Sequence, residues 1–387
     1  MHNNVFGNDI VIKEKSGNLE IVIDNKETRV FQPQNTTLES IIVRAYRGYI
    51  TMGAINWLNW HKVSLSFLNV TGQIKSSINP SNTQKGILTL NQFQIHENKE
   101  MRMKFARRLI QDKVNSQYNF LSDLQKYFQI KIPEIELNEM NELKTITDIM
   151  NYEGRYARKY WEGMKSVITQ IDSTVSFSGR DTRDSNGRNA GNFINASLNY
   201  LYAVLEHQVR TSLFATGFDS TIGILHETTT NKQPLIYDLM EPFRYLADMS
   251  LIDLLSKRKL NKRMFTLQPN YVMTCNPSTA KLLIDQIQYN LSRKIKTAGQ
   301  NRTVYTRIDE YVTHWKKSFL SHSLPSIKIP NLPIEMNLEA SMKQRIAEMS
   351  YTEANEIGLN KSTLYYLKHR QQTKIYGKVM QKLNGKK

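Results

Sequence analysis

The N-terminal part of the chain alternates apolar and polar positions with a period of two, the pattern of half-buried β-strands. Three such runs, IVIKEK, LEIVID and TRVFQP, are separated by the turn-forming stretches SGN and DNKE. A short apolar segment from Tyr49 to Trp60 predicts a helix, and VSLSFLNV, which begins at Val63, predicts a further strand. Residues 1–80 therefore predict a small β-domain, in which Trp57 and Trp60 are core residues.

After this region the apolar positions recur every three or four residues, which is the period of an amphipathic helix. Long helices are predicted over three ranges: Glu97 to Leu124, Leu143 to Ile168 and Phe193 to Ala215. The third ends at Gly217, a residue type that favours helix termination. Further helices fill the chain to about Leu320, so residues 93–322 predict an all-α domain.

Polar, turn-rich stretches interrupt these patterns. NPSNTQKG, from Asn79 to Gly86, predicts a hinge, which we place over residues 81–92. The segment Ile171 to Gly191 predicts a mobile loop inside the helical domain, and Ser323 to Pro333 predicts a second linker.

The last part of the chain, residues 335–387, predicts a helix-turn-helix unit with a basic tail. A short helix meets Gly358 in a tight turn, and Asn360 can cap a second helix. This spacing is typical of DNA-reading helices, although any small helical hairpin has the same pattern. Candidate DNA contacts in this unit are Lys361, Ser362, Thr363, Tyr366 and Arg370. The whole chain predicts an α+β multidomain fold: an N-terminal β-domain, a larger all-α domain and a C-terminal helix-turn-helix.

The composition indicates the kind of binding partner and the cell compartment. The formal net charge of +17 attracts polyanions, of which nucleic acid is the commonest. An ordinary basic enzyme and a membrane-surface binder are the alternatives, but no basic amphipathic anchor helix is evident. The single cysteine, Cys275, excludes a disulfide framework and a thiolate zinc cluster. With no apolar signal core and no long apolar run, the sequence predicts a cytoplasmic protein without a membrane span.

Basic side chains in the helical region are candidate contacts to DNA phosphates. They are Arg102, Arg107, Arg108 and Lys113 on the first long helix, and Arg180 and Arg183 in the polar loop. Arg180 and Arg183 are explained equally well as residues of a solvent-exposed loop.

Glu153 is a charged residue within an apolar stripe. On a helix it shares one face with Ala157, Tyr160, Trp161 and Met164. An unpaired carboxylate in such surroundings costs several kcal/mol, so it needs a partner such as a metal ion or an arginine. The alternative is a helix-start glutamate at the edge of the stripe.

A histidine and two acids follow. His226 ends the apolar run STIGILHE, where a hydrogen-bonded structural histidine is the more frequent case. Asp238 and Glu241 lie in PLIYDLMEPFR, where a helix N-cap with its capping-box partner is an equal alternative. Two carboxylates and an imidazole form an oxygen-rich site suited to Mg²⁺ or Mn²⁺, which can polarise a phosphodiester and activate a hydroxyl.

Taken in order, these motifs resemble the CRISPR adaptation integrase family. The ordered features are ITMGAINWLNWHKVSLSFLNVTGQI, a hinge, RMKFARRLIQDKVNSQYNFL, EGRYARKYW, NASLNYLYAVLEHQVRTSLFATGFDSTIGILHE and PLIYDLMEPFR, within residues 1 to about 320. The resemblance assigns metal binding to Glu153, His226 and Glu241, and makes Asp238 a further acidic residue of the catalytic site. The family usually has an aspartate as the third ligand, so Glu241 is a departure.

The resemblance implies a β-domain hinged to a helical catalytic domain, working as a homodimer on double-stranded DNA. It implies metal-dependent transesterification, in which the 3′-hydroxyl of a short duplex attacks a target phosphodiester, and a small companion subunit if the setting is CRISPR adaptation. The helix-turn-helix is an addition found in some archaeal CRISPR integrases and in casposases, their transposon-encoded homologues. A non-catalytic helix-turn-helix DNA-binding protein and a plain metal nuclease remain the alternatives.

Overall fold

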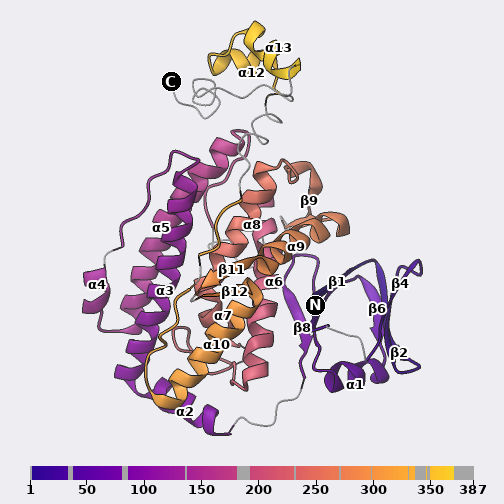
Figure 1. Ribbon diagram of the computed structural model, residues 1–387, viewed down its shortest axis with the longest axis vertical. Coiled ribbons are helices and arrows are strands. Elements are labelled where there is room, and N and C mark those ends of the chain that lie inside the picture. The colour runs from indigo at the N-terminus through magenta and orange to yellow at the C-terminus, as the bar shows by residue number, and fades with distance from the viewer. Residues whose placement is uncertain are drawn as a thin grey trace.

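The computed structural model describes residues 2–33, 38–80, 86–135, 137–180, 192–230, 232–269, 272–297, 299–329, 331–335, 346 and 349–369. Strands dominate its N-terminal region and long helices the remainder, which confirms the predicted α+β fold class (Figure 1). Among the described residues, no helix is both long enough and apolar enough to cross a lipid bilayer.

Two four-stranded sheets build the N-terminal region, with strand orders β4-β3-β2-β6 and β1-β5-β7-β8. The strands are β1 (His2–Phe6), β2 (Asp9–Lys15), β3 (Asn18–Ile23), β4 (Glu27–Phe31), β5 (Ser40–Arg44), β6 (Arg47–Ile50), β7 (Ser64–Leu68) and β8 (Ile74–Ile78). The alternating runs are therefore strands, as the period of two predicts. Helix α1 (Met52–Trp60) begins later than predicted, because Tyr49 belongs to β6 and the side chain of Thr51 caps the helix.

The two tryptophans of α1 differ in burial. Trp57 is buried in the β-region core, and its Nε1 donates a hydrogen bond to Gly17 O over 2.9 Å. Trp60, at the end of the helix, is 83% exposed. The predicted core role is therefore correct for Trp57 and wrong for Trp60, because the chain turns away at that point and leaves the ring uncovered.

The first long helix, predicted over Glu97 to Leu124, is α3 (Lys99–Gln125), and a separate helix, α2 (Gly86–Glu97), precedes it. Asn98 divides them, because its side chain accepts a hydrogen bond from Met101 N and caps the second. The helices of this region are α2 (Gly86–Glu97), α3 (Lys99–Gln125), α4 (Leu137–Glu142), α5 (Ile146–Ile171), α6 (Phe193–Thr216), α7 (Pro234–Met240), η1 (Glu241–Phe243), α8 (Arg244–Ser256), η2 (Lys262–Met264), α9 (Pro277–Ser292) and α10 (Val304–Ser321). Helix α2 occupies part of the range predicted as a hinge, and α6 ends at Gly217 (φ 85°) as predicted.

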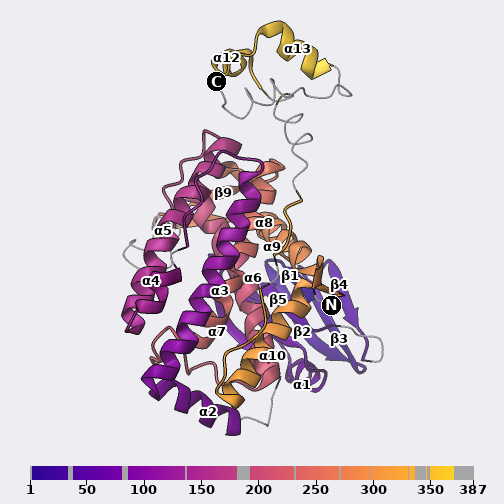
Figure 2. The same ribbon diagram turned by 60° about the vertical axis from the view of Figure 1, so that its left-hand side comes forward.

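Helix α8 lies at the centre of the helical region, and nearly every one of its side chains is buried. Helices α6 and α9 pack against it, and α3 and α5 run side by side (Figures 1 and 2). Two short antiparallel pairs interrupt the helices: β9 (Phe265–Leu267) with β10 (Met273–Cys275), and β11 (Lys294–Thr297) with β12 (Gln300–Thr303). The prediction of an all-α domain was wrong at these strands, which are too short to show a period of two.

The β-region is docked on the helical region through buried polar contacts. The hydroxyl of Tyr200 donates to Val70 O over 2.6 Å, and Gly72 (φ 80°) lies against the same ring, where a Cβ would approach it to 2.7 Å. Nδ1 of His207 lies 2.7 Å from Ser66 Oγ, both groups being buried. These contacts fix one face of the sheet β1-β5-β7-β8 against α6.

The segment predicted as a second linker packs along α3 instead. The guanidinium of Arg108 donates to Pro325 O and Ile327 O, over 2.7 and 2.5 Å. Leu332 is buried, and its N–H donates to the hydroxyl of Tyr245 over 3.3 Å. The described residues of 322–335 therefore form a strap across the helical region, which we call the α3 strap.

The C-terminal unit has a small core of its own and lies beyond one end of the helical region (Figure 2). Helices α12 (Tyr351–Glu356) and α13 (Lys361–His369) are joined by a turn with Gly358 at φ 73°. Asn360 accepts from Thr363 N over 2.8 Å, as the predicted cap requires. The buried residues of the unit are Ile346, Met349, Ala354, Leu359 and Leu364.

Candidate active site

Two glutamates from different elements converge on one ammonium group. Glu153 lies well inside α5, Glu241 opens η1, and Lys113 projects from the middle of α3. Nζ of Lys113 hydrogen-bonds Oε1 of Glu153 and lies 2.5 Å from Oε2 of Glu241. The Lys113 and Glu241 side chains are buried, and Glu153 is 24% exposed. The carboxylate predicted to need a partner within the apolar stripe has one, and it is a lysine.

Charge is retained in this cluster despite its burial. Burial alone would raise the pKa of Glu241, but the guanidinium of Arg244 and the ammonium of Lys113 lower it to about 2. Burial would likewise lower the pKa of Lys113, but Glu241 and Glu153 outweigh it and raise that pKa. The Arg244 Nε lies 2.9 Å from Glu241 Oε1, so the two oxygens of Glu241 face two different cations.

Asp238 holds His226 and the loop that carries it. Its fully buried carboxylate accepts the backbone N–H groups of Ile224 (2.6 Å), Leu225 (3.0 Å) and His226 (3.2 Å). The same carboxylate lies 2.6 Å from Nδ1 of His226, and this hydrogen bond raises the pKa of the imidazole against its burial. Nε2 is thereby left for a ligand, since the His226 side chain is 40% exposed.

The capping alternative for Asp238 and Glu241 is wrong. Asp238 lies inside α7, whose N-cap position is Gln233, and Glu241 begins a separate 3₁₀ turn. The helix-start alternative for Glu153 is also wrong, because α5 begins at Ile146 with Thr145 and Asp148 as its capping box.

Helices α2 and α3 hold the His226 loop from the other side. Gln92 exchanges hydrogen bonds with the backbone of Asp219, donating to its oxygen and accepting from its nitrogen, each over 2.9 Å. Nδ1 of His96 lies 2.8 Å from Gly223 O, and Arg102 donates to Ile224 O over 2.8 Å. The imidazole is therefore positioned by a loop fixed on both flanks.

A buried aromatic network lies behind Arg244. The hydroxyls of Tyr160 and Tyr202 donate to the two oxygens of Asp248, over 2.6 and 2.7 Å. The guanidinium carbons of Arg244 and Arg180 lie 5.0 and 4.9 Å from the centre of the Tyr202 ring. Burial raises the pKa of Asp248 to about 6. The ring of Tyr202 thus orients the arginine that pairs with Glu241.

The donor set fits a hard divalent cation. Oε2 of Glu241 is buried, and the Lys113 ammonium lies 2.5 Å from it. Within the described part of the chain, no three His, Cys, Asp or Glu side chains lie close enough to hold a metal ion together. Glu153 and Glu241 meet at Lys113, while His226 interacts with Glu241 only electrostatically.

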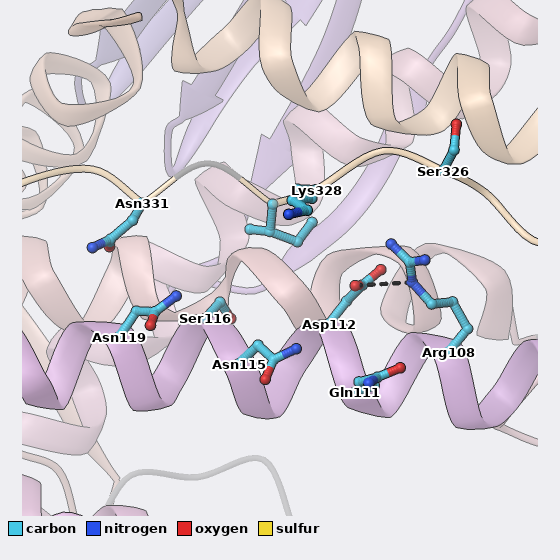
Figure 3. Close-up of a pocket in the computed structure, with 10 residues that line it drawn as sticks. Arg108, Gln111, Asp112, Asn115, Ser116, Asn119, Ser326, Lys328 and Asn331 are labelled. Carbon is cyan, nitrogen blue, oxygen red and sulfur yellow. Dashed lines mark hydrogen bonds and ion pairs between the residues drawn. The ribbon is translucent and has the colours of Figure 1, made fainter. Parts of the chain in front are cut away.

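The basic residues of α3 that were predicted to contact DNA bind other groups of the protein instead. Arg108 is one of the side chains that line a pocket of about 400 Å³ between α3 and the α3 strap (Figure 3), and its Nε lies 3.0 Å from Asp112 Oδ1. Arg102 binds the His226 loop and Glu227, and Arg107 donates to Leu143 O. For Lys113 the surface phosphate contact is wrong, because its ammonium is buried between carboxylates.

The remaining predicted DNA contacts divide into three groups. Arg180 packs on Tyr202 and donates to Asn199 Oδ1 over 3.0 Å. Arg183 and Arg370 lie outside the described residues. In the C-terminal unit, Lys361, Ser362 and Tyr366 are exposed and Thr363 is partly exposed, so their DNA contact stays a prediction.

The sequence reasoning missed three residues of the cluster: Arg244, Tyr202 and Asp248. It also missed the site role of Lys113, although a signal was present. Lys113 falls in the apolar stripe of α3 after Leu109 and Ile110, the same kind of anomaly that singled out Glu153. The burial of Arg244 and Asp248 depends on α8 being enclosed on every side, which no local pattern shows.

The fold places this chain among α+β proteins in which a β-region packs on a helical region. Its site combines two glutamates with a histidine that an aspartate holds. The family model of "CRISPR associated protein Cas1" matches residues 4–289. The chain belongs to the Cas1 family, as the order of its motifs predicted. A curated relative from Clostridium perfringens, the CRISPR-associated endonuclease Cas1, is 26% identical over 260 residues, 65% of this chain and 76% of that protein. One from Archaeoglobus fulgidus is 25% identical over 313 residues, 76% of this chain and 86% of that protein.

Solved structures agree with the family. A casposase bound to integration product matches with a TM-score of 0.79 and 26% identity, covering 91% of this chain and all of that one (100%). A Cas1 protein from Thermotoga maritima matches with a TM-score of 0.69 and 18% identity over 84% of this chain, which shows the shared fold. Since curated relatives are named endonucleases and one structural relative is a casposase bound to integration product, the family includes nucleases and integrases.

Proposed function

We propose that this chain is a divalent-metal-dependent DNA integrase, which joins the 3′-hydroxyl ends of short duplex DNA to a target strand. One observation carries the proposal: carboxylates from α5 and η1 meet at a single cation beside a histidine that Asp238 orients. Glu153, Glu241 and Nε2 of His226 would hold Mg²⁺ or Mn²⁺. A bound ion of this kind would polarise the target phosphodiester and activate the attacking hydroxyl.

The reaction balances without an energy source. The 3′-oxygen of the incoming duplex forms a bond to the target phosphorus, the bond from that phosphorus to the target's own 3′-oxygen breaks, and the hydroxyl proton passes to the leaving oxygen. Asp238 keeps the imidazole oriented through Nδ1, so Nε2 is the ring nitrogen that would bind the ion. Arg244 stands next to Glu241 as a cation available to phosphate oxygens, with 24% of its side chain exposed.

Spacer acquisition in CRISPR adaptation is the first candidate setting, and casposon integration is the second. The second is favoured by the degree of structural similarity: the casposase matches 91% of the chain with a TM-score of 0.79 and 26% identity, and the Thermotoga maritima Cas1 protein matches 84% with a TM-score of 0.69 and 18% identity. We propose that the C-terminal unit binds duplex DNA through exposed residues of α13, including Lys361 and Tyr366. A homodimer, with a small companion subunit in the CRISPR setting, is the proposed working form.

A strand-transfer assay tests the proposal. A labelled duplex with free 3′-hydroxyls is incubated with supercoiled plasmid and Mn²⁺, and joined product is separated from simple cuts. We expect joined product from the wild type and loss of at least about a thousandfold in Glu153→Gln, with unchanged DNA affinity. Cuts without joining would identify a plain nuclease. Full activity of Glu153→Gln would identify the acids as structural and leave a DNA-binding protein.

The two settings are separated with the same assay. Duplexes that carry transposon terminal repeats are compared with duplexes of unrelated sequence, with and without a companion subunit. Joining of terminal-repeat ends by this chain alone supports the casposase. Joining of unrelated short duplexes that requires the companion supports CRISPR adaptation.

A further inference from the structure

Lys113 occupies the point at which two of the proposed metal ligands meet. Its ammonium hydrogen-bonds Oε1 of Glu153 and lies 2.5 Å from Oε2 of Glu241. The side chain is 9% exposed, and it reaches this point from α3, which supplies neither glutamate. A buried ammonium is stable only when paired, and here both partners are proposed ligands of the same ion.

A divalent ion and this ammonium cannot share the position. Mg²⁺ binds carboxylate oxygens at about 2.1 Å, so an ion that reaches both glutamates must lie close to where Nζ now lies. Two cations at such a separation repel strongly in a buried site. The lysine therefore has to leave before an ion can bind Glu153 and Glu241 together.

The arrangement also indicates which cation leaves. Arg244 Nε lies 2.9 Å from Oε1 of Glu241, the oxygen that does not face Lys113, and its guanidinium packs on the Tyr202 ring. Arg244 can therefore remain when Oε2 changes partner. Lys113 is the cation that contacts both glutamates, so its exchange frees both ligands at once.

We propose that Lys113 is a built-in counter-cation of the metal-free site, which holds Glu153 and Glu241 together and is displaced when a divalent ion binds. This inference rests on the proposed metal-dependent function and adds a competitor to it. In the metal-free protein the lysine prevents repulsion between two buried carboxylates. The same contact weakens metal affinity, because every bound ion must first displace the ammonium.

Binding of Mn²⁺ to the full-length chain tests the competition. The protein is stripped with a chelator and titrated with MnCl₂, and free Mn²⁺ is measured by electron paramagnetic resonance. Melting temperatures are recorded with and without Mn²⁺. The variants are Lys113→Met, which removes the charge, and Lys113→Gln, which keeps a hydrogen-bond donor for the carboxylates. Lys104→Met is the matched control, since Lys104 is an exposed lysine on the same helix. Glu153→Gln, which removes the charge of one proposed ligand, shows whether Mn²⁺ binds at this site.

We expect Lys113→Met and Lys113→Gln to bind Mn²⁺ at least about tenfold more tightly than the wild type. Their metal-free melting temperatures should fall, and Mn²⁺ should raise them by more than it raises that of the wild type. Lys104→Met should match the wild type. Should Lys113→Met fail to fold without metal, recovery of its helical circular dichroism on Mn²⁺ addition supports the inference, and Lys113→Gln supplies the affinity.

Two negative outcomes are distinct. If the wild type binds Mn²⁺ and Glu153→Gln does not, but neither lysine variant binds more tightly, Lys113 is no competitor and this inference alone is overturned. If neither the wild type nor the lysine variants bind Mn²⁺, the proposed metal-dependent function fails, and the inference fails with it.

Discussion

Nδ1 of His226 lies 2.6 Å from Oδ1 of Asp238, a carboxylate that is fully buried. The same carboxylate accepts three consecutive backbone N–H groups of the loop before it. One side chain therefore fixes both the course of the loop and the direction of the imidazole. Asp238 was proposed as a catalytic acid, but it acts through His226 and is therefore a positioning residue.

Asp238→Asn should weaken both the loop and the site. An amide nitrogen cannot accept, so at least one of the four N–H groups that the carboxylate now binds is left buried and unpaired. We expect the free energy of unfolding in urea to fall by about 1–3 kcal/mol. Strand transfer and Mn²⁺ affinity should fall as well. Asp285→Asn, at an exposed acid, is the control. An unchanged free energy of unfolding in Asp238→Asn would contradict the anchoring role.

Arg108→Ala should destabilise the protein without weakening DNA binding. The substitution removes two hydrogen bonds to the α3 strap and the ion pair of buried Asp112, whose pKa burial raises. Losing one partner of a buried pair costs about 3 kcal/mol. The measurements are urea unfolding and DNA affinity at several salt concentrations, with Lys104→Ala as the exposed control on the same helix. A normal stability with a reduced salt dependence of binding would instead support the phosphate contact that the sequence predicted.

His207 makes the docking of the β-region sensitive to acid. Burial lowers the pKa of this imidazole to about 3, from an ordinary value of 6.5. Because the folded value lies below the unfolded one, the unfolded chain binds the extra proton between these two pH values. Stability is therefore complete above pH 6.5 and is lost as the pH falls, by about 1.4 kcal/mol per pH unit.

The measurement is urea unfolding at pH 5.5 and 7.5 for the wild type and for His207→Gln, which can still hydrogen-bond Ser66. We expect the wild type to lose more stability than the variant on acidification, by about 1 kcal/mol. His369→Gln, at an exposed histidine of α13, should behave like the wild type. Equal losses in all three proteins would show that His207 is not buried in its neutral form.

How much of this structure the sequence predicts depends on how far apart in the sequence the interacting residues lie. The strands β2, β3, β4 and β7, the α6 terminus at Gly217 and the anomalous acid at Glu153 follow from local periodicity and are found as predicted, whereas β1, β5, β6 and β8 were not predicted as separate strands. The partner of Glu153 does not follow, because Lys113 lies on another helix and only the packing of α3 against α5 brings them together. The sequence predicts Arg108 to be a surface cation, because the α3 strap that covers it comes from about two hundred residues further along the chain.

Asp248→Asn should reveal the cost of burying a carboxylate beneath Arg244. Burial raises the pKa of Asp248 from 3.8 to about 6, although two tyrosine hydroxyls and two arginines favour the charged form. Between those values the folded protein keeps a proton that the unfolded chain has released, so wild-type stability falls as the pH rises. Asparagine carries no charge and escapes this loss. The stability of the variant relative to the wild type should therefore improve between pH 4 and 7, by up to about 3 kcal/mol. Urea unfolding across this range gives the comparison, with Asp285→Asn as the exposed control. A difference that does not vary with pH would mean that Asp248 is already ionised at pH 4, and that the arginines stacked on Tyr202 fully compensate for its burial.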